Sequence, residues 1–200
     1  MNKKSKGIMG EIRETFLYIV IVFFVVSILN SEVYAISEVR QYSMEDTLFE
    51  GELLYIDKIG YHFSEPRAGD IVIFLQGETR EGFYERLIYV LEDMKIKFQN
   101  EGRRNRFVKR VIGVPGDQIN IEDGKIYVND KLMKESYAKG ETYKGVEELP
   151  IIVPEGKLFV VGDNRERSND SRAFGLVDYK SIEGKVIFRF WPIDRLGSFK

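Results

Sequence analysis

The chain holds few side chains that could activate a nucleophile. Its 200 residues include one histidine, His62, and no cysteine. A Ser-His-Asp triad would have to use His62, and a zinc site built on cysteine or histidine lacks its ligands. Because His62 lies between Tyr61 and Phe63, we interpret it as a structural or surface residue. Nucleophilic catalysis therefore needs a different base, and a lysine that has lost its proton is the obvious substitute.

Lys109 is the candidate for such a base. It lies in the strand-like run FVKRVI at 107–112, where alternation places Lys109 between apolar neighbours on one face and Arg110 between apolar neighbours on the other. One of these two cations must therefore project among apolar side chains. Burial disfavours the charged form of an amine and can bring its pKa near neutrality. Read alone, a lysine in a strand is more often a solvated charge at the edge of a sheet.

Two further segments supply hydroxyl groups. Ser43 stands in QYSMEDTL at 41–48, just beyond an apolar segment that ends near residue 36, although a lone serine there would usually be a turn or capping residue. The segment GDNRERSNDSR at 162–172 is dense in turn formers and predicts a structured loop. Ser168 in this loop could place a hydroxyl beside a buried amine, and Asp170 and Arg172 are candidates for a structural ion pair.

Together these segments resemble the type I signal peptidases, the bacterial Ser/Lys leader peptidase family in its small Gram-positive-like form. Ser43-Met44 with Thr47-Leu48 matches the nucleophile box, KRVIGVPGD at 109–117 matches the lysine box, and 162–172 followed by Gly175 matches the third box. The order and spacing agree, and the similarity extends to FRFWP at 188–192. A mainly β fold follows from the resemblance, with a signal-peptidase-like antiparallel sheet as the catalytic domain.

The resemblance also implies a mechanism and a substrate class. Neutral Lys109 takes the proton of Ser43, an acyl-enzyme forms, and Lys109 then activates the hydrolytic water. The supporting serine falls on Ser168, expected to hydrogen-bond the lysine amine. Four positions that hold the fold are Asp163, Arg165, Asp170 and Arg172. No metal or cofactor is needed, and the family's substrates are exported preproteins with small side chains one and three residues before the cut.

Two positions near Ser43 depart from the family pattern. Asp46 replaces a usual proline, which predicts a more mobile loop. Gln41 stands where relatives carry serine or glycine, so its amide is a possible oxyanion-hole donor beside the Ser43 backbone N–H. These departures keep an alternative open, a signal-peptidase-like pilus assembly factor that binds pilin subunits with little dependence on cleavage. A self-cleaving regulator is a further alternative, but its usual DNA-binding module is not visible before residue 37.

The N-terminus predicts how the site is held at a membrane. Four basic residues within 3–13 precede an uncharged run at 15–31, which suits a bilayer span if neighbours to about Ile36 extend it. The positive-inside rule then places residues 1–14 in the cytoplasm, 15–36 in the membrane, where they contact lipid, and 37–200 outside as the catalytic domain. The rival interpretation is a cleavable secretory signal, since Val33-Tyr34-Ala35 imitates a processing site.

The rest of the chain predicts one mainly antiparallel β domain. Seven strands are expected, at Leu53–Asp57, Asp70–Leu75, Phe107–Val114, Gln118–Glu122, Lys125–Val128, Lys157–Val161 and Gly184–Phe190. Asp123-Gly124 predicts a hairpin turn, and helical spacing of apolar residues predicts an inserted amphipathic helix at 81–99, packed on the sheet or acting as a lid or docking element. The near balance of 30 basic and 32 acidic residues argues against a nucleic-acid partner.

Overall fold

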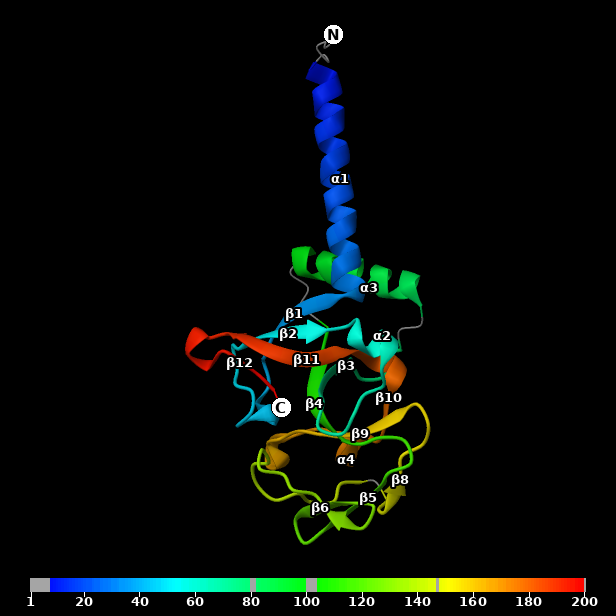
Figure 1. Ribbon diagram of the computed structural model, residues 1–200, viewed down its shortest axis with the longest axis vertical. Helices are drawn as coiled ribbons and strands as arrows, with labels where there is room; N and C mark the ends of the chain where they lie inside the picture. The colour runs from blue at the N-terminus through cyan, green and yellow to red at the C-terminus, as the bar shows by residue number, and fades with distance from the viewer. Residues whose placement is uncertain (1–7, 80–81, 100–103, 147, 200) are drawn as a thin grey trace.

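The computed structural model describes residues 8–79, 82–99, 104–146 and 148–199. A long helix rises from one end of a β domain, a second helix lies crosswise at its base, and a small sheet forms the far end (Figure 1). The helices and strands are α1 Ile8–Glu32, β1 Tyr34–Glu38, β2 Leu53–Asp57, α2 Gly60–Phe63, β3 Ile71–Leu75, α3 Phe83–Gln99, β4 Arg106–Gly113, β5 Gln118–Glu122, β6 Lys125–Val128, β7 Lys131–Leu132, β8 Ile151–Ile152, β9 Lys157–Val161, α4 Ser171–Phe174, β10 Val177–Asp178, β11 Ile182–Trp191 and β12 Gly197–Ser198.

Helix α1 begins earlier and ends sooner than the predicted span at 15–36. Its 25 residues carry apolar side chains that are mostly exposed, and it is long and apolar enough to cross a membrane. The expected extension to Ile36 is wrong, because residues from Tyr34 onward pair with β2, where Ala35 lies opposite Ile56. Lys58 fixes this junction, since its Nζ donates to the carbonyl of Asn30 at 2.7 Å near the helix C-terminus.

The large sheet carries the elements that bring the candidate residues together. Its strand order is β1-β2-β11-β3-β4-β9-β10, with β12 paired to β11, and every pairing is antiparallel. The central strand β3 is buried along its whole length, which explains its continuous apolar run IVIFL. Strand β4, which carries Lys109, therefore lies in the interior of the sheet between β3 and β9.

A smaller sheet of order β7-β6-β5-β8 covers the other end of the core. Strands β5 and β6 form the predicted hairpin, and Asp123 and Gly124 both adopt positive φ, of 47° and 72°. An apolar cluster joins the two sheets, with Ile112 and Phe159 from the large sheet packed against Ile119 from the small one. The mainly antiparallel β fold is thus confirmed.

The predicted amphipathic helix is confirmed as α3, Phe83–Gln99; residue 81 lies outside the described residues. Instead of lying flat on the sheet, α3 packs against α1 and crosses its base (Figure 1). Arg86 of α3 makes a bidentate ion pair with Glu32 at the end of α1, with N–O distances of 2.8 to 3.1 Å. Three side chains of α3, Val90, Asp93 and Met94, line the large groove described below.

Candidate active site

Ser43 and Lys109 meet in the interior of the protein. The Nζ of Lys109 lies 2.7 Å from the Oγ of Ser43, and only 1% of the lysine and 6% of the serine are exposed. Ser43 is the middle residue of a single turn of 3₁₀ helix, Tyr42–Met44, and the side chain of Met44 is buried in the core. A hydrogen-bonded pair of hydroxyl and amine shielded from water is the arrangement in which a neutral lysine can activate a serine.

Burial lowers the pKa of Lys109. Removal of the amine from water brings the pKa from its ordinary 10.5 to about 8, while the charge of Asp170 acts in the opposite direction. The Nζ also donates to the carbonyl of Val108 at 3.1 Å and lies 5.5 Å from the centre of the Phe107 ring. A substantial fraction of Lys109 is therefore neutral at mildly alkaline pH, as a general base requires.

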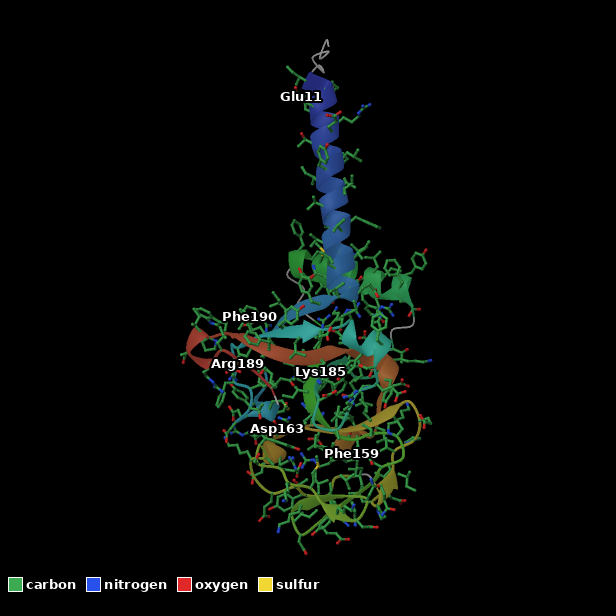
Figure 2. The ribbon with its side chains drawn as sticks, viewed as in Figure 1. Glu11, Phe159, Asp163, Lys185, Arg189 and Phe190 are labelled. Atoms are coloured by element: carbon green, nitrogen blue, oxygen red, sulfur yellow. The ribbon has the colours of Figure 1, made fainter. Side chains whose placement is uncertain are left out.

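Arg110 is buried too, which the alternation argument left open. Its guanidinium forms a bidentate pair with Asp163 at 2.9 and 2.7 Å and stacks over the Tyr137 ring. The same carboxylate accepts a short hydrogen bond from the hydroxyl of Thr47, four residues after Ser43. Asp163 therefore joins the strand that carries the lysine to the loop that carries the serine, and Figure 2 shows it inside the β domain.

Asn164 extends this connection through the backbone. Its N–H donates to the carbonyl of Ser43 at 3.0 Å, and its side-chain amide donates to the carbonyl of Tyr42 at 3.1 Å. The serine turn is thus hydrogen-bonded on both sides to the loop that follows β9. Asn164 was not singled out from the sequence, although it stands between two residues of the third box.

The remaining predicted loop residues form two buried ion pairs. Arg165 pairs with Glu135 at 2.6 Å and also donates to the hydroxyl of Thr142. Asp170 pairs with Arg172 at 2.8 Å, and its second oxygen accepts the N–H of Gly162. These contacts close the loop on itself and on residues 135–142, so the arrangement suits a supporting role for all four predicted positions.

Ser168 does not make the expected contact. Its Oγ is buried and has no hydrogen-bond partner among the described residues, whereas the Lys109 amine is turned toward Ser43 and Val108. The hydroxyl nevertheless lies close to the nucleophile turn, because a Cβ added to Gly162 would overlap both the Ser168 Oγ and the Ser43 carbonyl. Ser168 is therefore beside the pair without contacting the amine.

Replacing Gly162 with alanine is expected to push the serine turn away from the lysine. The added methyl meets a backbone oxygen that cannot rotate aside, and such overpacking costs about 1–3 kcal/mol. We expect a lower free energy of unfolding and slower peptide-bond cleavage. Gly197→Ala is the matched control, because its new Cβ meets nothing within 4 Å. Equal behaviour of the two variants would contradict the close approach at Gly162.

The two positions that depart from the family pattern both have partners. The Gln41 side chain donates to the amide oxygen of Asn105 at 3.3 Å, and Asp46 accepts from Lys139 at 3.0 Å. His62 pairs with Glu32 at 3.7 Å, as expected of a structural or surface residue. In the part of the chain that the structure describes, no three histidine or acidic side chains gather in a way that could hold a metal ion.

A groove of about 1140 Å³ leads to Ser43. One wall is the apolar face of α1 from Thr15 to Asn30, and another is β1 with the residues that follow it to Gln41. Ser43, Met44 and Leu48 line the groove at its base, and α3 borders it with the side chains named above. An extended, largely apolar segment could therefore lie along β1 with one of its peptide bonds at Ser43.

Comparisons with known proteins identify the family of the chain. Residues 12–191 match the family profile described as signal peptidase, peptidase S26. The chain belongs to the signal peptidase family. The enzyme is therefore a serine peptidase that removes signal peptides from preproteins.

Two curated signal peptidases resemble this one over most of their length. Signal peptidase IB of Staphylococcus aureus strain COL is 33% identical over 198 residues, covering 91% of both chains. Signal peptidase I of Leptolyngbya laminosa is 35% identical over 155 residues, covering 78% of this chain and 68% of the relative. A crystal structure of signal peptidase I from Enterococcus faecalis is 29% identical with a TM-score of 0.42, covering 62% of this chain and 97% of the other.

Proposed function

We propose that this signal peptidase is a membrane-anchored endopeptidase whose nucleophile is Ser43 and whose general base is Lys109. The 2.7 Å separation of Nζ and Oγ in a buried setting carries the proposal. A charged amine donates across this distance, and a neutral amine accepts the serine proton across the same distance. The lowered pKa of Lys109, about 8, makes the neutral form accessible.

The chemistry proceeds in two halves. The Ser43 Oγ attacks the carbonyl carbon of the scissile peptide while its proton passes to Lys109 Nζ. The C–N bond then breaks, the lysine returns the proton to the departing amine, and an acyl-enzyme remains. Lys109 next takes a proton from a water that attacks the ester carbonyl; the bond from that carbon to Ser43 Oγ then breaks, the lysine returns the proton to Oγ, and the second product leaves as a carboxylic acid.

The developing oxyanion needs hydrogen-bond donors near Ser43. The Ser43 N–H belongs to the first turn of the 3₁₀ helix, where backbone N–H groups have no partner within the helix. Gln41 lines the groove, and its amide must leave Asn105 to serve as the second donor. Ser168 stays the proposed support of the lysine, and its buried Oγ beside the serine turn, with no hydrogen-bond partner among the described residues, leaves it available for that role. Asp163, Arg165, Asp170 and Arg172 hold the loop around it.

The anchor is α1, with residues 1–14 in the cytoplasm, the apolar segment in the bilayer and the catalytic domain, which begins with β1 at Tyr34, outside. The basic N-terminal flank and the exposed apolar surface of α1 support this topology. The alternative of a secretory signal removed after Ala35 is less well supported than the anchor, because Ala35 lies within β1 and is paired with β2. The alternative role in pilus assembly gains no support, since the relatives described above are signal peptidases.

Cleavage of an exported preprotein with alanine one and three residues before the cut tests the proposal. We expect the full-length enzyme to release the mature N-terminus, identified by mass spectrometry. Phenylalanine in place of the alanine next to the cut should slow release by at least about tenfold, because substrates of this family carry small side chains at that position. Equal rates for the two preproteins, or binding without any cleavage, would contradict a signal-peptidase function and revive the assembly role.

A further inference from the structure

Helix α3 presents an apolar face that the described residues leave uncovered. Besides Phe83 at its first position, its exposed apolar side chains are Tyr84, Ile88, Leu91, Met94 and Phe98, with exposures from 41% at Leu91 to 94% at Phe98. The spacing of three or four residues places them along one side of the helix. A cluster of this size in a helix of 17 residues indicates a surface that contacts something apolar.

The opposite face of α3 is fixed to the rest of the protein by charge. Arg86 binds Glu32 at the end of α1, and Asp93 binds Arg104 at 3.1 Å. The Arg104 guanidinium in turn lies over the ring of Tyr89, 4.3 Å from its centre. The helix cannot roll to bury its apolar side without breaking these contacts, so the uncovered face is a set feature of the fold.

The position of α3 indicates what covers that face. Figure 1 shows α3 lying crosswise at the base of α1, on the side of the β domain from which α1 rises. Glu32, the last residue of α1, is the residue that Arg86 holds. If α1 crosses a bilayer, α3 lies where the chain leaves it and runs parallel to the membrane surface.

We propose that α3 is a second membrane contact, an amphipathic helix lying in the interface of the bilayer that α1 crosses; this rests on the anchor in the proposed function. Aromatic side chains favour the boundary between headgroups and acyl chains, and Tyr84 and Phe98 stand near opposite ends of the helix. Lys95 is exposed on the same side of the helix, where its apolar stem can lie along lipid and its amine can reach lipid phosphates. Because Val90 and Met94 line the groove, this contact also holds the groove against the membrane.

The absence of cysteine makes the proposal directly measurable. Single-cysteine variants of the full chain, Ile88→Cys and Leu91→Cys, are labelled with a fluorescent dye and reconstituted into phosphatidylcholine vesicles with and without bromine on the acyl chains. Bromine quenches only dyes that contact lipid chains. Leu132→Cys is the matched control, an exposed apolar position in the distal small sheet, and Val22→Cys reports on α1 itself. Preprotein cleavage by the variants labelled at 88, 91 and 132 verifies their folding, and thermal unfolding verifies that of Val22→Cys, because Val22 lines the groove.

Brominated lipid is expected to quench the dyes at 88 and 91 about twofold or more above the dye at 132. Quenching at 22 without quenching at 88 and 91 would overturn the proposal and leave the anchor intact. Absence of quenching at 22 would instead contradict the anchor. Protection of 88 and 91 from both brominated lipid and aqueous iodide would overturn the proposal in favour of a protein cover. If that protection fell on dilution with lipid, the cover would be a second copy of the chain.

Discussion

Replacing Lys109 with methionine is expected to abolish preprotein cleavage while leaving the enzyme folded. Methionine fills the space of the buried stem but cannot accept the proton of Ser43, whose Oγ lies 2.7 Å from the amine. Loss of a positioned general base costs about 10²–10⁴-fold in rate. The measurement is kcat/KM for a preprotein in vesicles or detergent micelles, with the product N-terminus identified.

The pH profile of the unaltered enzyme supplies the second readout. Only the neutral amine accepts a proton, and burial lowers the pKa of Lys109 to about 8. The rate should therefore rise about tenfold per pH unit below that value and level off above it. Lys109→Arg keeps a cation that cannot lose its proton in this range, so it should stay inactive at every pH.

Lys109→Met should raise the free energy of unfolding at neutral pH. The lysine pKa is lower in the folded state, about 8, than in the unfolded state, near 10.5, so between these values the unfolded chain binds more protons and stability rises with pH. Below about pH 8 the cost of the buried charge is present in full, roughly 3 kcal/mol. Lys109→Met removes that cost, whereas the partly exposed Lys157→Met should not. Chemical unfolding at pH 7 and pH 10 measures the difference.

The double variant decides whether the two residues act as one unit. Ser43→Ala alone should reach the same low rate as Lys109→Met, and combining them should cause little further loss. Multiplicative losses, or retention of most activity in Lys109→Met, would contradict the proposed dyad.

Asp163→Asn is expected to cause the largest loss of stability. The carboxylate is fully buried and neutralises Arg110, which is only 4% exposed, so asparagine leaves an uncompensated guanidinium in the interior. Breaking one partner of a buried pair costs about 3–5 kcal/mol. Because Asp163 also binds Thr47, the serine turn should lose its connection to β4, and cleavage should slow in the remaining folded protein. Thermal or urea unfolding and kcat/KM measure the two effects.

Lys157→Gln is the control for this ion pair. Lys157 and Asp178 form a pair at 3.1 Å whose side chains are 39% and 32% exposed, and such pairs contribute about 1 kcal/mol or less. A double variant, Asp163→Asn with Arg110→Met, should recover part of the lost stability, because the unpaired charge is then gone. If Asp163→Asn lowers the free energy of unfolding no more than Lys157→Gln does, the buried pair does not stabilise the fold as argued.

The strands could be predicted where turn-forming residues mark their ends in the sequence. Strands β2, β5, β6 and β9 match their predicted ranges, because apolar and β-branched runs end at Gly, Asp or Pro. Strand β1 was missed because Tyr34, Ala35 and Ile36 read equally well as the end of an apolar helix. Only pairing with β2 distinguishes the two. The two-residue strands β7, β8, β10 and β12 are too short to show any period.

The site could be predicted only in part. Alternation along β4 indicated that a cation there has apolar neighbours. Nothing in the local sequence shows that Ser43 lies beside the amine of Lys109, and that expectation came from the resemblance. Arg110 and Asn164 were missed as supports because their partners lie far away in the sequence. The Ser168 contact was expected from the family; among the described residues the amine bonds Ser43 and the carbonyl of Val108 instead.

Val33 is the only residue between helix α1 and strand β1. Helix α1 ends at Glu32, β1 begins at Tyr34, and Lys58 ties the two together. Within this helix of 25 residues the uncharged run is 15–31, about 25 Å long and shorter than the roughly 30 Å hydrocarbon core, so the proposed anchor requires the bilayer to thin around it. Because one residue joins α1 to β1, the proposed anchor would hold the sheet at a set height above the bilayer. Lipid thickness is then expected to decide how far Ser43 stands from the membrane surface.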